Sequence, residues 1–153
     1  MRGRTTLLAA LAALTIALLA TGVAGAARPS AASKPATVSV RKTKLGRVLV
    51  DAQGRTLYLF LKDKRNKSEC AGACATGWPP LLTRGKPKAS HGSRAKLLGT
   101  TVRKSGTQVT YAGQPLYTFA GDSKAGQTNG EGSKAFGAAW YVLAPNGHRI
   151  DKH

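Results

Sequence analysis

Short apolar runs separated by turn residues begin near residue 38 and continue almost to the end of the chain. In three places two such runs are joined by a short segment that contains glycine, which is the pattern of a β-hairpin. The pairs are residues 48–50 with 56–61, residues 108–111 with 116–119, and residues 140–143 with 148–150. No stretch of residues 38–153 has a sustained helical period, and the glycines between positions 121 and 137 disfavour long helices. The pattern therefore predicts a mainly β protein with long glycine-rich loops.

The first two hairpins are copies of each other. Both end in the phrase L-Y-x-F-x-x-D, which is written TLYLFLKD over residues 56–63 and PLYTFAGD over residues 115–122. The residues before the phrase also align when one residue is deleted at the turn, where a hairpin varies most easily. We therefore expect duplicated β-hairpin repeats that form one small antiparallel-sheet domain over residues 38–153, with repeat one at about 45–82 and repeat two at about 106–143.

The strand that ends the first repeat's hairpin is apolar on both faces. Side chains alternate along a strand, so Leu57, Leu59 and Leu61 point one way and the two aromatic residues between them point the other way. This pattern suits a central strand covered on both sides. We expect the motif side chains to build the core and its turns, namely Tyr58, Phe60, Asp63, Tyr117, Phe119 and Asp122.

The two motif aspartates allow two interpretations. Aspartate accepts hydrogen bonds from nearby backbone N–H groups and so forms turns, and this is the interpretation that we favour for Asp63 and Asp122. The alternative is a hydrolase or lyase in which both carboxyl groups converge on one pocket as general acid and base. No nucleophile elbow, zinc-protease motif, phosphate loop or Ser–His–Asp pattern accompanies them. We therefore predict no catalytic residues, no cofactor and no enzymatic activity.

Cys70 and Cys74 are the only cysteines and form a C-x-x-x-C pattern. This spacing fits neither haem attachment nor a thioredoxin-like motif. Two thiols with the scattered residues His91, His148 and His153 are also a poor set of zinc ligands. In an exported chain we expect a local disulfide, and a redox or metal-handling module that uses this pair is the alternative function.

A Trp-Pro-Pro segment follows the cysteines. Proline has a fixed φ and no N–H, so Pro79 and Pro80 exclude a central strand. We interpret Trp78, Pro79 and Pro80 as a rigid plug that closes the core. A tryptophan that stacks on carbohydrate is the alternative.

The N-terminus has the parts of a secretory signal peptide. Arg2 and Arg4 precede an apolar run from Leu7 to Ala20, and the small residues 24–26 form an A-x-A site. We therefore predict a signal peptide over residues 1–26, followed by a flexible tether over residues 27–37. The alternative is an uncleaved anchor, because about 20 apolar residues suffice to span a bilayer.

The charge is strongly positive. The chain has 24 Lys and Arg against 6 Asp and Glu, a net charge of +18. Cleavage would remove two arginines and leave 24 − 2 − 6 = +16. Such a polycation adheres to polyanions, although charge can also serve solubility alone. No specific nucleic-acid motif is present. The candidate contacts to anionic cell-wall polymers or lipid headgroups are Lys62, Lys64, Arg65, Lys67, Arg84, Lys86, Lys88, Arg94 and Lys96.

The sequence resembles a bacterial family of secreted or lipoprotein repeats of unknown function, which has a Y-x-[FWY]-x-x-D motif. The resemblance rests on Tyr58–Asp63 and Tyr117–Asp122, on the segments CAGACA (70–75) and WPPLL (78–82), and on YAGQPLY (111–117) with Trp140 beyond it. It covers about residues 45–143 and implies export and a two-copy domain, but no activity. Many members are lipoproteins, whereas this sequence has no lipobox cysteine. We thus expect a secreted, non-enzymatic, basic protein at the bacterial cell surface or wall, and the sequence leaves its oligomeric state open.

Overall fold

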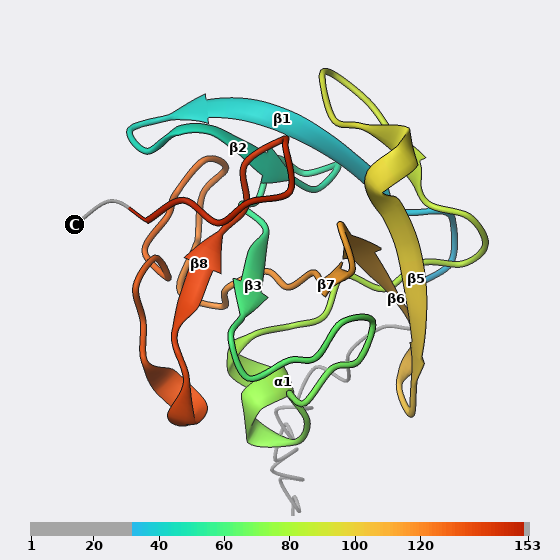
Figure 1. Ribbon diagram of the computed structural model, residues 1–153, viewed down its shortest axis with the longest axis vertical. Coiled ribbons are helices and arrows are strands. Elements are labelled where there is room, and N and C mark those ends of the chain that lie inside the picture. The colour runs from blue at the N-terminus through green and yellow to red at the C-terminus, as the bar shows by residue number, and fades with distance from the viewer. Residues whose placement is uncertain (1–31, 152–153) are drawn as a thin grey trace, which may run out of the picture.

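The computed structural model describes residues 32–151, so the predicted signal peptide and residues 27–31 of the predicted tether lie outside it. The prediction of a mainly β fold is confirmed: eight strands, one short α-helix and two 3-10 helices follow one another (Figure 1). The elements are β1 (Thr37–Thr43), β2 (Gly46–Val50), β3 (Tyr58–Phe60), α1 (Ala73–Gly77), β4 (Lys88–Ala89), η1 (Ala95–Leu97), β5 (Leu98–Arg103), β6 (Gly106–Tyr111), β7 (Gln114–Pro115), η2 (Ala135–Gly137) and β8 (Trp140–Val142).

The strands form small sheets with the orders β2-β1-β4, β3-β8 and β5-β6-β7. All strand pairs are antiparallel except β1 with β4. In Figure 1 the β1–β2 hairpin covers the top of the molecule, the β5–β6 hairpin stands at its right, and β3 and β8 lie between them and the left edge.

The duplicated hairpin begins one strand earlier than the sequence pattern indicated. Antiparallel β1–β2 and β5–β6 are equivalent, with the closing pairs Thr43↔Gly46 and Arg103↔Gly106. Each turn places glycine at positive φ, 105° at Gly46 and 130° at Gly106, where a side chain would be strained. The first strand of each hairpin carries exposed polar residues and few apolar ones, so hydrophobicity alone does not reveal it.

The other predicted pairings are shorter than expected. Beyond the Gly54 turn, β2 meets the next segment only through the Val50↔Thr56 bridge and a 2.9 Å bond from Leu57 N–H to the Leu49 carbonyl. The chain then continues into β3, whose partner is β8 of the second repeat, in the register Leu59↔Tyr141. The third predicted hairpin contains the single bridge Leu143↔Arg149.

The core is divided by β3 into two clusters. Tyr58 and Phe60 pack with Val48, Val50, Trp78, Tyr117, Trp140 and Val142, while Leu57 and Leu59 pack with Val38, Leu49, Val109, Tyr111, Leu116 and Leu143. The alternation predicted for the strand therefore holds over residues 57–60. It is wrong for Leu61, whose side chain is 46% exposed, because the strand ends at Phe60 and a turn begins.

Candidate functional site

The motif tyrosines and aspartates pair across the two repeats. The Tyr58 hydroxyl donates to Asp122 Oδ2 at 2.6 Å, and the Tyr117 hydroxyl donates to Asp63 Oδ2 at 2.7 Å. The backbones of the two tyrosines are also paired, since Tyr58 N–H donates to the Tyr117 carbonyl at 2.8 Å and Tyr117 N–H donates to the Tyr58 carbonyl at 3.0 Å. Each repeat thus supplies the tyrosine for the other repeat's aspartate.

The second carboxylate oxygen of each aspartate closes the loop that follows its own motif. Asp63 Oδ1 accepts the Glu69 N–H at 2.7 Å, and Asp122 Oδ1 accepts the Asn129 N–H at 2.9 Å. Each aspartate therefore combines a local loop contact with a contact to the other repeat. The two carboxyl groups bond to different tyrosines, and no hydrogen bond between these aspartates is present in the described residues.

The two tyrosine–aspartate pairs differ in their surroundings. Asp122 is 7% exposed, and the Tyr58 hydroxyl also accepts the Gly130 N–H at 3.3 Å. Burial, together with the hydrogen bond to Asp122, raises the pKa of Tyr58 far above its ordinary value. The Tyr58 hydroxyl therefore stays protonated and donates its hydrogen bond to Asp122 inside the core.

The other pair lies nearer the surface and belongs to a larger polar network. The Tyr117 hydroxyl is 2.7 Å from Ser68 Oγ, and Arg103 donates to Ser68 Oγ at 3.2 Å and to the Cys70 carbonyl at 2.7 Å. Burial raises the pKa of Tyr117 and also that of Asp63, while the hydrogen bonds from Glu69 and Tyr117 act against the shift of Asp63.

Sequence reasoning missed Arg103 and two of its acceptors. Arg103 ends β5 and also donates to Gln108 Oε1 at 2.9 Å, and Gln108 Nε2 in turn donates to the Leu116 carbonyl at 2.8 Å. Gln108 is fully buried, although its type is polar. Neither the spacing nor the composition of the sequence marks these side chains. Arg103 bonds to Gln108 within its own hairpin and also reaches Ser68 and Cys70 of the first repeat.

A column of four stacked rings lies beside the crossed pairs. Its order is Phe60, Trp140, Trp78 and Phe119, with centroid separations of 4.1, 3.9 and 4.3 Å. Tyr58 meets Trp78 edge-on at 5.3 Å, and Tyr117 meets Trp140 edge-on at 5.2 Å. Each motif phenylalanine thus stacks on the tryptophan of the other repeat, so the aromatic rings are exchanged in the same way as the aspartates.

The Trp-Pro-Pro segment lies against the second repeat. Trp78 is 1% exposed within the ring column, the Pro79 carbonyl accepts the Thr118 N–H at 2.9 Å, and Pro80 bridges to Tyr117. The tryptophan has no exposed face on which a sugar could stack. The disulfide predicted between Cys70 and Cys74 is present, and both cysteines are buried, at 1% and 6% exposure.

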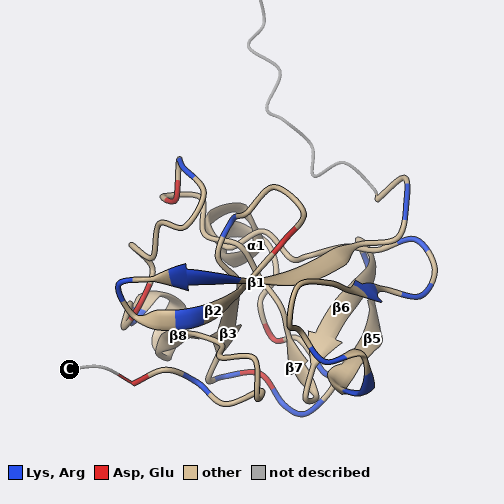
Figure 2. Cartoon of the chain, turned by 90° about the horizontal axis from the view of Figure 1, so that it is seen from above, with Lys and Arg blue, Asp and Glu red and all other residues tan. Residues whose placement is uncertain are grey.

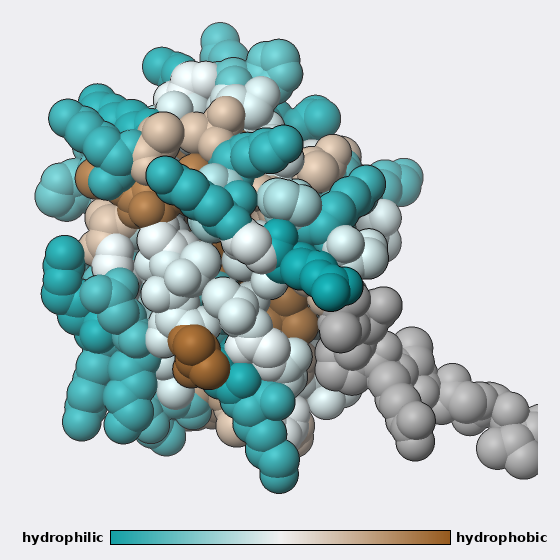
Figure 3. Space-filling view, turned by 90° about the vertical axis from the view of Figure 1, so that its right-hand side faces the viewer, coloured by the Kyte–Doolittle hydropathy of each residue, from teal (hydrophilic) through white to brown (hydrophobic). Residues whose placement is uncertain are grey.

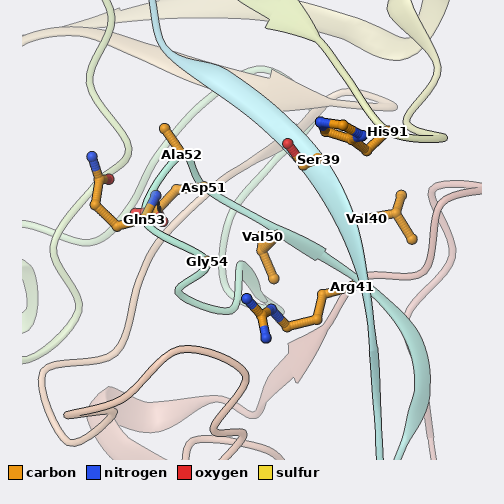
Figure 4. Close-up of a pocket in the computed structure, with 9 residues that line it drawn as sticks. All are labelled: Ser39, Val40, Arg41, Val50, Asp51, Ala52, Gln53, Gly54 and His91. Carbon is orange, nitrogen blue, oxygen red and sulfur yellow. Dashed lines mark hydrogen bonds between the residues drawn. The ribbon is translucent and has the colours of Figure 1, made fainter.

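A separate hollow of about 360 Å³ lies between β1 and the Gly54 turn, lined by Ser39, Val40, Arg41, Val50, Asp51, Ala52, Gln53, Gly54 and His91 (Figure 4). Arg41 points toward Gly54 in this view. Asp51 is occupied internally, since it accepts the N–H groups of Gln53 and Arg55 at 2.9 Å each and pairs with the Arg55 side chain at 2.7 Å. None of the motif residues lines this hollow.

A second, smaller hollow of about 330 Å³ lies along the β5–β6 hairpin and includes Gly85, Pro87 and Thr107. No cluster of three or more potential metal ligands occurs among residues 32–151. Within the same residues, no helix has the length and apolar character needed to cross a bilayer.

All nine predicted polyanion contacts are exposed. Lys62, Lys64, Arg65 and Lys67 lie on the loop that follows β3, and the other five lie on the connection between the repeats. Figure 2 shows that lysine and arginine are spread over several loops and hairpin tips, with few acidic positions between them. Lys67 is paired with Glu69 at 3.1 Å.

Comparison with known proteins gives one match. A family model described as a secreted repeat of unknown function, Lipoprotein_15, matches residues 39–82 and again residues 99–144. Together these segments cover more than half of the chain. The chain belongs to this family. The two matched copies begin within β1 and β5, so each contains nearly all of one duplicated hairpin. The comparisons with curated proteins and with solved structures gave no match.

The stability of this secreted-repeat protein should depend on pH through the ionisation of Asp63. Its folded-state pKa is raised above the ordinary value of 3.8, so its contribution to stability is full below that value and is lost as the pH rises through the folded-state pKa. We expect the stability of the wild type, relative to Asp63→Asn, to fall over this window. Urea unfolding of both proteins between about pH 3 and 7 measures the difference.

Glu69→Gln provides a control of opposite sign. The side-chain hydrogen bond and charge of Lys67 lower the pKa of Glu69 below 4.5, so its contribution is present above that value and is lost as the pH falls. If Asp63→Asn showed the same direction of change as Glu69→Gln, the assigned environment of Asp63 would be incorrect.

Proposed function

We propose that this family member is a non-enzymatic, basic protein of the bacterial cell surface or cell wall that contacts anionic polymers. The observation that carries this proposal is the state of its six acidic side chains. In residues 32–151 three of them form ion pairs with surface cations. With only 6 Asp and Glu against 24 Lys and Arg, most cations of the chain have no carboxylate to pair with.

The partners of the acidic residues fall into two groups. Asp51, Glu69 and Asp151 form ion pairs with Arg55, Lys67 and Arg149. Asp63, Asp122 and Glu131 accept hydrogen bonds from tyrosine hydroxyls or backbone N–H groups. The chain has 24 Lys and Arg in total, and only three of those in residues 32–151 form ion pairs. The uncompensated positive field favours association with polyanions.

The described contacts also favour a scaffold over an active site. The motif tyrosines and aspartates bond to one another, and in residues 32–151 every buried side-chain nitrogen or oxygen has a hydrogen-bond partner. A catalytic centre needs groups that are free to meet a substrate. The phrase that the two repeats share instead holds the repeats together, and the exposed loops remain free to make contacts.

Retention on isolated teichoic-acid-containing cell wall at increasing salt tests the proposal. We expect strong retention at low salt and a steep decrease as salt rises, because each neutralised anion releases counterions. Retention that does not depend on salt, or no retention at low salt, would contradict the proposal.

A charge-matched pair of variants tests the assigned residues. One variant replaces Lys62, Lys64, Lys86 and Lys88 by serine, and the other replaces Lys42, Lys44, Lys104 and Lys124, which are also exposed. The measured quantity is the slope of the logarithm of the binding constant against the logarithm of the salt concentration. Each lost contact lowers the size of this slope by roughly 0.7–0.9, so we expect the first variant to lower it by about 3. The second variant should lower it less. Equal reductions would exclude the assigned loops as the contact surface.

A further inference from the structure

Two of the three exposed large apolar side chains in residues 32–151 lie at the same end of the molecule. They are Leu61 at 46% exposure and Phe136 at 44%, whereas Val102 at 86% lies on β5. Leu61 N–H donates to the Ala139 carbonyl at 3.0 Å and so extends the β3–β8 pairing toward the loop that carries Phe136. In Figure 1 helix α1 and the loop before β8 lie at the bottom of the molecule, and β3 runs down toward them.

Phe136 is held outward by an unusual backbone. Its φ is 64°, in the left-handed region that bulky residues rarely adopt. The loop is fixed from inside, because Trp140 Nε1–H donates to the Ala135 carbonyl at 2.9 Å. The ring lies beside α1, since a Cβ built on Gly77 would be 3.8 Å from its Cε2 atom. Backbone strain at an exposed aromatic side chain is a reason to look for a binding role.

The polar residues next to these two side chains are basic. Lys62 follows Leu61 and Lys134 precedes Phe136, and both lysines are exposed. The nearest acidic residues along the chain are engaged, since Asp63 bonds to Tyr117 and Glu131 accepts the Val142 N–H at 2.7 Å. Neither of the two hollows described above includes Leu61 or Phe136. The end therefore offers protruding apolar side chains with basic neighbours.

We propose that this end, made of Leu61, Lys62, Lys134 and Phe136, docks onto the surface of an anionic lipid bilayer. Leu61 and Phe136 would enter the interfacial region, and the two lysines would contact the headgroups. Weak apolar insertion and electrostatic attraction together give stable membrane association where either alone gives little. The face on the β5 side is mainly hydrophilic, with some apolar side chains among the polar ones (Figure 3).

Co-sedimentation with vesicles tests this surface on the full chain. The probes are vesicles of phosphatidylglycerol mixed with phosphatidylcholine and vesicles of phosphatidylcholine alone. We expect binding to the anionic vesicles only. The double variant Leu61→Ser/Phe136→Gly should bind them about ten-fold more weakly, as expected when two half-exposed apolar side chains are lost from an interface. Glycine adopts positive φ readily, so it removes the ring and keeps the loop conformation.

Val102→Ser is the matched control, because it removes a more exposed apolar side chain from another face. It should leave vesicle binding unchanged. Cell-wall retention should be unaffected by the double variant, which separates this proposal from the polymer contacts. Equal loss in the control, no loss in the double variant, or equal binding to neutral vesicles would overturn the docking surface.

A gain of signal provides a test that does not depend on weakened binding. Phe136→Trp should show a blue shift of its added emission when anionic vesicles are mixed in, measured against wild type, whose two tryptophans are buried. Val102→Trp should show no shift. An emission shift in Val102→Trp would place the membrane contact on the β5 face instead. No emission shift in Phe136→Trp would exclude Phe136 from the membrane contact.

Discussion

Trp140→Ala is expected to lower the free energy of unfolding by about 4 kcal/mol, in the range typical of a buried tryptophan replaced by alanine. Trp140 has no exposed surface and stacks between Phe60 at 4.1 Å and Trp78 at 3.9 Å. Its removal opens a cavity and leaves rings from both repeats without a partner. Chemical denaturation followed by far-ultraviolet circular dichroism measures the loss.

Tyr141→Ala is the control for this prediction. Tyr141 is the next residue of β8, but its side chain points to the other face and is half-buried. Its ring stacks beneath the Arg149 guanidinium at 4.7 Å, which is a surface contact. We expect a loss of about 1–2 kcal/mol there. A Trp140 variant no less stable than the Tyr141 variant would show that the ring column does not hold the repeats together.

Tyr58→Phe is expected to destabilise the protein by about 2 kcal/mol, although it removes a single oxygen atom. The hydroxyl is the donor to Asp122 Oδ2, and Asp122 is 7% exposed. Without the hydroxyl this oxygen faces a largely dry site, and an unsatisfied buried acceptor bears its full desolvation cost. Urea unfolding at neutral pH measures the change.

Tyr117→Phe should cost less, which makes it the matched comparison. Asp63 is only half-buried, so water can replace the lost hydroxyl, and Ser68 Oγ lies in the same network. If Tyr117→Phe were the more destabilising of the two, burial would not govern the strength of these pairs.

The duplication and the composition of the core could be predicted from the sequence. The repeated phrase L-Y-x-F-x-x-D marks Tyr58 and Tyr117 directly, and their burial follows from the apolar run around them. The C-x-x-x-C spacing also led to the disulfide that the structure contains. These features depend on residues close together in the sequence, so they can be recognised without knowledge of the long-range contacts.

The crossing of the motifs could not be predicted. A tyrosine and an aspartate spaced as in Tyr58 and Asp63 read the same whether they bond within one repeat or between two. The choice depends on the β3–β8 pairing, which joins residues 80 positions apart in the register Phe60↔Trp140. Long-range pairing of this kind leaves no periodic signal.

The first strand of each repeat was missed for a different reason. The β1 segment Thr37–Thr43 exposes Arg41 and Lys42, and the β5 segment Leu98–Arg103 exposes Thr100 and Val102, so neither strand shows a regular apolar alternation. Their hairpins are specified by turns with Gly46 and Gly106 at positive φ. Turn chemistry therefore identifies the start of each repeat better than hydrophobicity does.

Double-mutant cycles test most directly whether the two repeats exchange their motif side chains. Tyrosine is replaced by phenylalanine and aspartate by alanine, and the coupling free energy is measured for all four tyrosine–aspartate combinations. We predict coupling of about 1 kcal/mol or more for Tyr58 with Asp122 and for Tyr117 with Asp63. Coupling should be near zero within a repeat, for Tyr58 with Asp63 and for Tyr117 with Asp122. Stronger coupling within the repeats than between them would contradict the crossed arrangement.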